Sequence, residues 1–254
     1  MYCMKNLSKS RPIVLITATR REMQAVLSAH AQGLSLALNA PMEISWGARS
    51  LILLITGIGL VNAAMALGAL LGQRKGTLGG VVNMGIAGSF DLDVLPLGAV
   101  AAAKTEIWPE FGLHTEENVD PKGLGLGHGR VHGRVVWDSL PLNPDQEAKS
   151  MGLALDPSWL RVTSVSVAGV SGTRERASQL RAQTGALVEN MEGFALAWAC
   201  RLHGLPFLQI RTISNQVGSR NPEDWAMNKA FSRLGPVAEC ALGLVEDPLP
   251  GKGQ

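Results

Sequence analysis

"PIVLITATRREMQAVLSAHAQ" spans residues 12–32. Its opening run, 12–17, is apolar and rich in β-branched residues, which predicts a buried strand. From residue 20 to residue 32, the apolar side chains recur at helical spacing. A strand followed at once by a helix is the repeating unit of a sheet with helices on both faces. This stretch therefore indicates the α/β fold class.

The same alternation continues along the chain. We expect further strands at 50–59, 79–90, 97–107, 160–167, 186–189 and 205–214, and further helices at 60–73, 173–185, 191–204 and 222–245. Thr173 is the expected N-cap of its helix, and Pro236 is expected to break or kink the last one. No internal repeat stands out. We expect one domain over residues 1–254, with flexible ends at 1–11 and 247–254.

One segment, residues 108–157, departs from the alternation. It is rich in Gly, His and charged residues. We interpret it as a loop excursion near a site or as a hairpin at the edge of the sheet.

Composition excludes several classes of protein. Hydrophobic residues make up 46% and charged residues 17% of 254 residues, as in ordinary globular proteins. The net charge of +2 supplies no basic footprint for nucleic acid. Three cysteines without a CxxC pair predict neither a metal cage nor a disulfide framework. Residues 1–12 lack the apolar core of a signal peptide, and no apolar run suffices for a membrane span. We expect a cytoplasmic protein without a membrane partner.

Ligands of such sheets bind beyond the carboxyl ends of the strands, so the residues there carry the functional hypotheses. "TGIG" (56–59) and "NMGIAG" (83–88) are interpreted as tight glycine turns that let backbone N–H groups approach a ligand. Neither fits the G-x-G-x-x-G pattern of a dinucleotide site.

Three carboxylates stand at strand-to-helix junctions. Glu22 is either a general acid or base at the ligand edge or a favourable charge in the first turn of a helix. Glu189 and Glu192 flank Met191. Either carboxylate suits the paired hydroxyls of a ribose, and the alternative is again a favourable charge at a helix start.

Five blocks of sequence together resemble the purine nucleoside phosphorylase and nucleosidase superfamily. They are "LITATRREMQAVL" (15–27), "TGIGLVNAA" (56–64), "VVNMGIAGSFDLDVLPLGAV" (81–100), "VENMEGFALAWAC" (188–200) and "IRTISNQVG" (210–218). The blocks follow the order of the superfamily and cover most of residues 12–240. Within it, "ISNQVGSRNPEDW" most resembles the futalosine hydrolases, nucleosidases of an alternative menaquinone route. The resemblance implies a phosphorylase-like, three-layer α/β/α fold around a central mixed sheet.

The resemblance also implies roles for particular residues, carried over to these positions. Glu22 would activate water. Met191 and Glu192 would hold the ribose hydroxyls. Asn215, which follows Ser214, would contact the purine, and Ala87 and Gly88 would lie beside sugar and base. The substrate would be a small nucleoside, with neither metal nor cofactor required. A homo-oligomer is expected, either a dimer or a multiple of one.

Asn215 bears on the identity of the base. Adenine-releasing members of the superfamily carry Asp at this place. A 6-oxopurine presents a carbonyl there. A carboxylate would place a second acceptor against this carbonyl, whereas an amide donates to it from its NH₂ group and still accepts from a ring N–H. Asn215 therefore predicts a hypoxanthine-type leaving group, with futalosine as the expected substrate and inosine as an alternative. Asn215 as a simple cap of the following turn is the structural alternative.

Water rather than phosphate is the expected nucleophile. Hexameric phosphorylases of the superfamily place an Arg where this chain has Asn83, and an amide has no charge for an anion. Arg20 and Arg21 are close enough to the edge of the first strand to reach an anion, and the alternatives are a solvated helix face or contact with a substrate carboxylate. A phosphate-dependent phosphorylase and an inactive nucleoside-binding protein are the alternatives. Three arginines are candidates for a carboxylate on the 5′ substituent: Arg174, Arg176 and Arg220.

Overall fold

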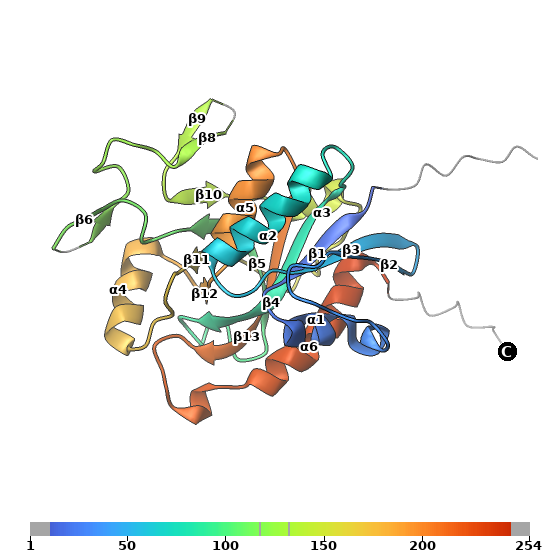
Figure 1. Cartoon of the computed structure of the whole chain (residues 1–254). Helices are drawn as coiled ribbons and strands as arrows, with labels where there is room; N and C mark the ends of the chain where they lie inside the picture. Colours follow the sequence, from blue (N-terminus) through green and yellow to red (C-terminus); the bar gives the residue numbers. More distant parts are fainter. Residues whose placement is uncertain (1–10, 117, 132, 245–254) are drawn as a thin grey trace, which may run out of the picture.

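A nine-stranded mixed sheet with helices on both faces forms the body of the protein (Figure 1). The computed structural model describes residues 11–116, 118–131 and 133–244. The flexible ends expected at 1–11 and 247–254 lie outside the described residues, apart from Arg11. The predicted α/β class with a central mixed sheet is confirmed. Within the described residues, no helix is long and apolar enough to cross a membrane.

The sheet strands are β1 (Ile13–Thr17), β2 (Met42–Trp46), β3 (Arg49–Ile55), β4 (Gly80–Ser89), β5 (Val100–Ile107), β10 (Ser139–Pro141), β11 (Leu160–Ser166), β12 (Val188–Asn190) and β13 (Phe207–Gln216). The helices are α1 (Arg20–Leu27), α2 (Leu60–Gln73), α3 (Pro144–Ser150), α4 (Arg174–Thr184), α5 (Gly193–Leu202) and α6 (Met227–Leu242). Most elements lie where the sequence predicts them, and Thr173 caps α4 as expected.

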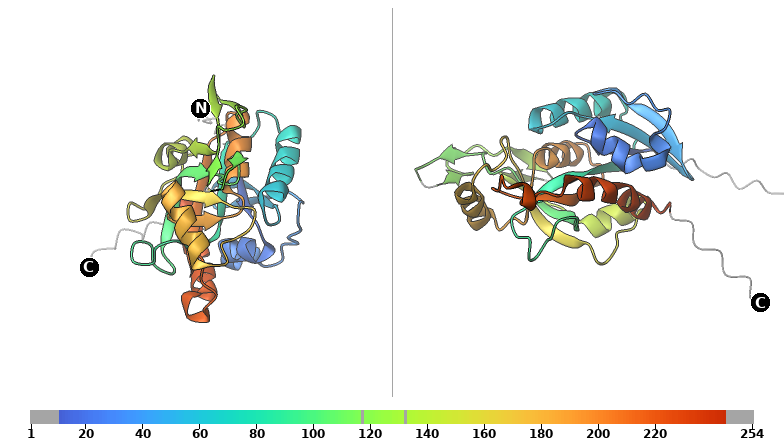
Figure 2. Two further views of the ribbon diagram at one scale, coloured as in Figure 1. Left: turned by 90° about the vertical axis from the view of Figure 1, so that its left-hand side faces the viewer. Right: turned by 90° about the horizontal axis from the view of Figure 1, so that it is seen from below.

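Alternating side chains of the central strands build the two apolar layers. In β1, Ile13 and Leu15 pack in the core that α1 and α6 cover, whereas Val14 and Ile16 pack in the core that α2 and α5 cover. This is the period-two alternation of a strand that is buried on both faces. Figures 1 and 2 show α1 and α6 side by side on one face, with α2 and α5 on the other.

Five of the strands close into a ring. β13 pairs with β4 and β5, β5 pairs with β11, β11 with β12, and β12 returns to β4. One apolar side chain from each strand joins a common cluster inside the ring: Ala87, Ala101, Val162, Val188 and Ile213. β4 belongs both to this ring and to the parallel β1–β3 part of the sheet. It therefore links the two halves of the fold.

The irregular segment 108–157 contains structure that the sequence left undefined. Two small hairpins project from the body, β6–β7 (Leu113–His114 with Val119–Asp120) and β8–β9 (Gly129–Val131 with Arg134–Val136). β10 then pairs antiparallel with β5 at the edge of the sheet, and α3 follows. Both interpretations, an excursion and an edge hairpin, therefore describe part of the segment.

The interpretation of "NMGIAG" as a turn is wrong: β4 runs through all of it, from Gly80 to Ser89, as the strand expected over 79–90 does. The expected break at Pro236 is also wrong, because the last helix runs unbroken from Met227 to Leu242 after a short 3₁₀ turn at Pro222–Asp224. A kink at Pro236 stays a prediction. The sequence also missed β2, a half-exposed strand at the sheet edge.

Close contact between α1 and α6 rests on a glycine. A Cβ at Gly235 would lie 2.0 Å from the Ser28 hydroxyl oxygen and 3.2 Å from the Ala25 carbonyl oxygen. We expect Gly235→Ala to lower the free energy of unfolding by about 1–3 kcal/mol, because the added methyl overpacks this contact. Urea denaturation provides the measurement.

Gly68→Ala is the matched control, since Gly68 lies inside α2 with no atom within 4 Å of an added Cβ. It should raise the free energy of unfolding by about 0.5–1 kcal/mol through helix propensity. Equal effects of the two substitutions would show that the α1–α6 contact tolerates a side chain at Gly235.

Candidate active site

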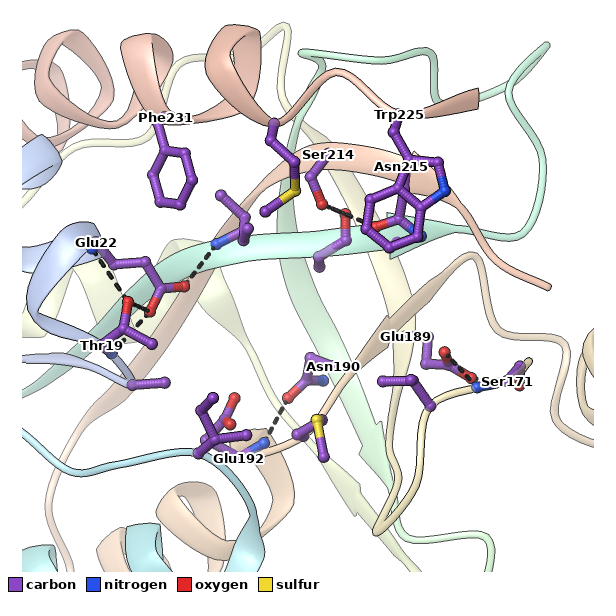
Figure 3. A pocket seen from close by; sticks show the side chains of 18 of the residues that line it. Thr19, Glu22, Ser171, Glu189, Asn190, Glu192, Ser214, Asn215, Trp225 and Phe231 are labelled. Atoms are coloured by element: carbon purple, nitrogen blue, oxygen red, sulfur yellow. Dashed lines mark hydrogen bonds between the residues drawn. The ribbon is translucent and has the colours of Figure 1, made fainter. Parts of the chain in front are cut away.

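A cavity of about 530 Å³ opens where β1, β4, β12 and β13 meet α1 and α6 (Figure 3). Sites for small molecules typically enclose roughly 300–1,000 Å³. All residues expected at the site line this cavity: Glu22, Ala87, Gly88, Met191, Glu192, Ser214 and Asn215. None of the described lining residues comes from segment 108–157, so the expectation that this excursion lies near the site is wrong for this cavity. The structure therefore brings together side chains from four separate blocks of the sequence.

Glu22 reaches across the strand ends from the first turn of α1. Its Oε2 accepts hydrogen bonds from the Thr19 backbone N–H at 2.9 Å and from the Thr19 hydroxyl at 2.8 Å. Its Oε1 accepts from the Ile86 N–H at 3.1 Å. The Thr19 hydroxyl accepts from the Glu22 N–H in return, which completes a capping box. The carboxylate thus caps a helix and lines the cavity at once.

A glycine in β4 provides room for this carboxylate. A Cβ at Gly85 would lie 2.5 Å from Glu22 Oε1. The strand can therefore pass directly beside Glu22 only because residue 85 has no side chain. This contact explains the glycine at position 85, and pairing with β13 keeps the glycine-rich stretch a strand.

Glu192 lies opposite, at the start of α5. Its Oε1 accepts from the Gly59 N–H at 2.9 Å, at the N-terminus of α2. The "TGIG" turn thus delivers a backbone donor to a carboxylate. Asn190 Oδ1 accepts from the Glu192 N–H at 3.0 Å and fixes the turn that carries it. Burial raises the pKa of Glu192, and the neighbouring Glu22 acts in the same direction, whereas Arg211 opposes both.

Arg211 is a buried cation that the sequence analysis missed. Its side chain is 3% exposed and donates to the carbonyls of Asn83 at 3.5 Å and Ile210 at 3.3 Å. Burial lowers the pKa of Arg211, while the Glu192 and Glu22 carboxylates act the other way. A charged residue within the apolar run of a strand was the available signal. The guanidinium is thus a buried positive charge that interacts with both carboxylates of the cavity lining, Glu22 and Glu192.

A fully buried carboxylate, Glu106, holds the Glu192 turn from behind. It accepts hydrogen bonds from the Ser166 hydroxyl at 2.7 Å, from the Asn190 amide at 3.2 Å and from the Gln209 amide. These partners lie on β11, β12 and β13, while Glu106 lies on β5. Because Asn190 also binds the Glu192 N–H, this network fixes the backbone from which Glu192 projects.

Asn215 reaches the cavity through a bulge in β13. Ile213 pairs with Ala87 and Asn215 pairs with Gly88, so Ser214 is an extra residue in the ladder. The Asn215 NH₂ donates to the Gln216 carbonyl at 3.1 Å, and its Oδ1 accepts from the Ser214 hydroxyl at 2.9 Å. Since a carbonyl only accepts, Gln216 fixes which end of the amide carries the hydrogens. Asn215 lines the cavity, and its second N–H has no acceptor among the described residues.

Glu189 lines the same cavity on the strand next to Asn190. Its Oε1 accepts from the Ser171 N–H at 3.0 Å, and its Oε2 accepts from the Ser171 hydroxyl at 2.6 Å. Burial raises the pKa of Glu189, and the two donors of Ser171 act in the opposite direction. The side chain is 6% exposed. It is thus a buried carboxylate that already has partners on one side.

The arginines and Asn83 lie in different environments. Asn83 is buried outside the cavity lining, where its amide donates to Gln209 Oε1 at 3.1 Å. Of the pair at the start of α1, Arg21 lines the cavity and Arg20 does not. The Arg21 guanidinium lies 4.1 Å from the centre of the Phe231 ring and donates to Asn228.

The three arginines that are candidates for binding a substrate carboxylate also lie in different environments. Arg174 faces Asp224 at 3.7 Å and Arg176 faces Glu110 at 3.3 Å, whereas Arg220 lines the cavity.

Two aromatic side chains complete the lining. Trp225 donates from its indole N–H to the Ser219 carbonyl at 3.1 Å, and its backbone bridges to Asn215. Phe231 projects from α6 above Glu22 (Figure 3). Phe231 gave no local signal, because its helical spacing is that of an ordinary packing residue.

Comparisons with known proteins agree with this geometry. The model of the phosphorylase superfamily matches residues 12–242. A futalosine hydrolase of Thermus thermophilus is 33% identical over 72% of this chain and 77% of its own length. A 5′-methylthioadenosine/S-adenosylhomocysteine nucleosidase of Marinomonas is 30% identical over 70% of this chain and 73% of its own. The crystal structure of such a nucleosidase from Helicobacter pylori, 16% identical, shares the fold with a TM-score of 0.69 and covers 93% of this chain and 98% of its own.

The buried Glu106 predicts a pH dependence of stability. Burial raises its pKa above the ordinary value of 4.5, so the folded state favours the protonated form. The resulting stabilisation is fully present below the ordinary value and is lost as the pH rises through the raised pKa. We expect Glu106 to contribute a slope of up to about 1.4 kcal/mol per pH unit in this window, and Glu106→Gln to remove it.

Urea unfolding of both proteins across this pH range gives the slope. Glu175→Gln, a substitution on the exposed face of α4, should keep the wild-type slope. Identical slopes for the wild type and Glu106→Gln would contradict the assignment.

Proposed function

The chain belongs to the phosphorylase superfamily, and within it we propose a nucleosidase that hydrolyses the N-glycosidic bond of a 6-oxopurine nucleoside. Its relatives from Thermus and Marinomonas are by name a futalosine hydrolase and a 5′-methylthioadenosine/S-adenosylhomocysteine nucleosidase, which supports hydrolysis of this bond. Futalosine is the substrate that we propose, because the Thermus relative is a futalosine hydrolase.

The position of Asn215 carries the proposal about the base. Its amide stands beside Gly88 in the cavity that also holds Glu22 and Glu192. The free N–H can donate to the O6 carbonyl or N7 of a 6-oxopurine. A carboxylate at this position would face two acceptors, the purine O6 and the Gln216 carbonyl, and could donate a hydrogen bond to neither. The local hydrogen bonds thus favour an amide independently of the substrate.

Glu22 and Glu192 define where the sugar would lie. In the proposed reaction, Glu22 takes a proton from water, whose oxygen forms the new bond to C1′. The bond between C1′ and the purine nitrogen breaks, and the base leaves with the electron pair. Asn215 stabilises the departing base by donating a hydrogen bond, worth about 1–3 kcal/mol when buried. Glu192 accepts from the ribose hydroxyls, and the positive charge that develops on the sugar lies between carboxylates.

The surroundings of Glu22 favour water over phosphate. Its carboxylate lines the cavity, and so does Glu192, so an anionic nucleophile would approach negative charge. Arg211 lies buried behind them and is outside the lining. Arg21 lines the cavity but stacks on Phe231 and donates to Asn228. Arg220, the other lining arginine, has a guanidinium nitrogen 3.9 Å from the Cβ position of Gly172, next to Ser171, whose hydroxyl binds Glu189.

Arg220 is our candidate for binding a carboxylate on the 5′ substituent. It lines the cavity, whereas Arg174 and Arg176 already face acidic side chains. The cytoplasmic location and the homo-oligomer expected from the sequence stay predictions.

Release of hypoxanthine from futalosine in phosphate-free buffer tests the proposal. We expect turnover by the wild type, and a loss of at least about 100-fold in kcat for Glu22→Gln, because an amide cannot take the proton from water. Circular dichroism should show an intact fold. Glu175→Gln is the matched control and should keep the wild-type rate. A strict requirement for phosphate would move the protein to the phosphorylases, and near-wild-type turnover by Glu22→Gln would remove Glu22 from the mechanism.

A further inference from the structure

Gly88 has a polar side chain on each side. In the ladder between β12 and β4, its partner is Glu189. In the ladder between β13 and β4, its partner is Asn215. The two residues therefore flank one glycine from opposite strands, although 26 positions separate them in the sequence.

Both side chains stand on the same face of the sheet. Directly paired residues of neighbouring strands project to one side. Val188 and Ala87 point into the ring of strands, so the next residues, Glu189 and Gly88, face outward. In β13 the bulge at Ser214 moves Asn215 onto this outward face, where its Nδ2 lies 3.1 Å from the position of a Cβ on Gly88.

The result is a slot with a glycine floor. Neighbouring strands lie about 4.8 Å apart, so the backbones of Glu189 and Asn215 are separated by roughly 10 Å across Gly88. Both polar side chains and Gly88 line the same cavity, of about 530 Å³. Figure 3 shows Glu189 and Asn215 on the side of the cavity away from Glu22, the expected attacking group. A base in this slot would therefore lie opposite the nucleophile.

Glu189 has acceptor capacity to spare. A carboxylate offers about four lone-pair sites, and the two donors of Ser171 occupy two of them. Ser171 also lines the cavity, so this face of the carboxylate borders the space where a ligand would bind. The mechanism proposed above assigns no role to Glu189.

We propose that Glu189 is a specificity-determining residue that accepts the N1–H of the 6-oxopurine, while Asn215 serves the adjacent O6 and N7. This inference rests on the proposed function and adds a second point of base recognition to it. A 6-oxopurine presents an acceptor at O6 and a donor at N1–H, side by side. The slot presents a donor from Asn215 and an acceptor from Glu189 in the matching order.

A 6-aminopurine inverts this pattern. Its N1 carries a lone pair that would face the Glu189 carboxylate, and its amino group would face the N–H of Asn215. Sites built for particular hydrogen bonds reject ligands that lack them, because buried groups are then left unpaired. Glu189 therefore disfavours adenine nucleosides, because its carboxylate would face the lone pair of N1.

Binding of free bases tests this role without turnover. Isothermal titration calorimetry with hypoxanthine, 1-methylhypoxanthine and adenine gives three dissociation constants for each variant. For the wild type, we expect hypoxanthine to bind at least about tenfold more tightly than either competitor. In Glu189→Gln the charge is lost and an NH₂ group replaces one oxygen. Hypoxanthine should then bind about tenfold more weakly, and its preference over adenine should shrink by a similar factor.

Two further variants separate base recognition from support of the loop. Ser171→Ala removes a partner of Glu189 but keeps the carboxylate, so it should retain the preference for hypoxanthine. Glu175→Gln is the matched control outside the cavity and should behave as the wild type. If Ser171→Ala reproduced the effect of Glu189→Gln, Glu189 would only anchor the loop, and the inference would be overturned.

The outcomes also distinguish this inference from the proposed function. Wild-type protein that binds 1-methylhypoxanthine as tightly as hypoxanthine would overturn the role of Glu189, whether or not Glu189→Gln folds. An unchanged preference in a folded Glu189→Gln would do the same, and phosphate-independent release of hypoxanthine would still support the proposed function. Tighter binding of adenine than of hypoxanthine by the wild type would overturn both.

Discussion

At two positions, 85 and 88, β4 passes so close to other side chains that a residue with a Cβ does not fit. At residue 85 a Cβ would lie 2.5 Å from the Glu22 carboxylate, and at residue 88 it would lie 3.1 Å from the Asn215 amide and 2.7 Å from Val217. Glycine avoids both steric overlaps, although glycine weakens a strand. Pairing with β1, β12 and β13 compensates for that weakness. The strand thus becomes the floor of the cavity, and the walls are the side chains that flank it.

Buried charge is the second constraint on the site. Glu22 and Glu192 line the cavity, Glu106 lies behind it, and Arg211 is the buried cation among them. Each carboxylate is held by backbone or side-chain donors: Thr19 and Ile86 hold Glu22, Gly59 holds Glu192, and the polar network holds Glu106. Such a cluster is costly to bury unless its hydrogen bonds are made. Its hydrogen bonds also preorganise the carboxylates for a positively charged sugar.

The sequence predicts the parts of this architecture that depend on local patterns. Strand and helix periods are local, so most elements lie where they were expected. Glu22 and Glu192 follow from their positions at the ends of strands. The strand expected over 79–90 is present, but the glycines in "NMGIAG" suggested a turn because the residues that require them, Glu22 and Asn215, approach from elsewhere in the chain. The bulge at Ser214 is likewise set by pairing with β4. Arg211 and Glu106 were missed because a charged residue in an apolar run indicates that it has a buried partner, but the sequence does not show which residue that partner is.

The central claim is that the slot over Gly88 distinguishes a 6-oxo group from a 6-amino group. An internal competition tests this most directly: futalosine and its 6-amino analogue, equimolar in one phosphate-free reaction, with both free bases quantified at low conversion. The ratio of hypoxanthine to adenine released equals the ratio of the two kcat/KM values. Hypoxanthine should exceed adenine by at least about tenfold, as expected when one buried hydrogen bond is lost. Equal release of the two bases, or an excess of adenine, would contradict the account.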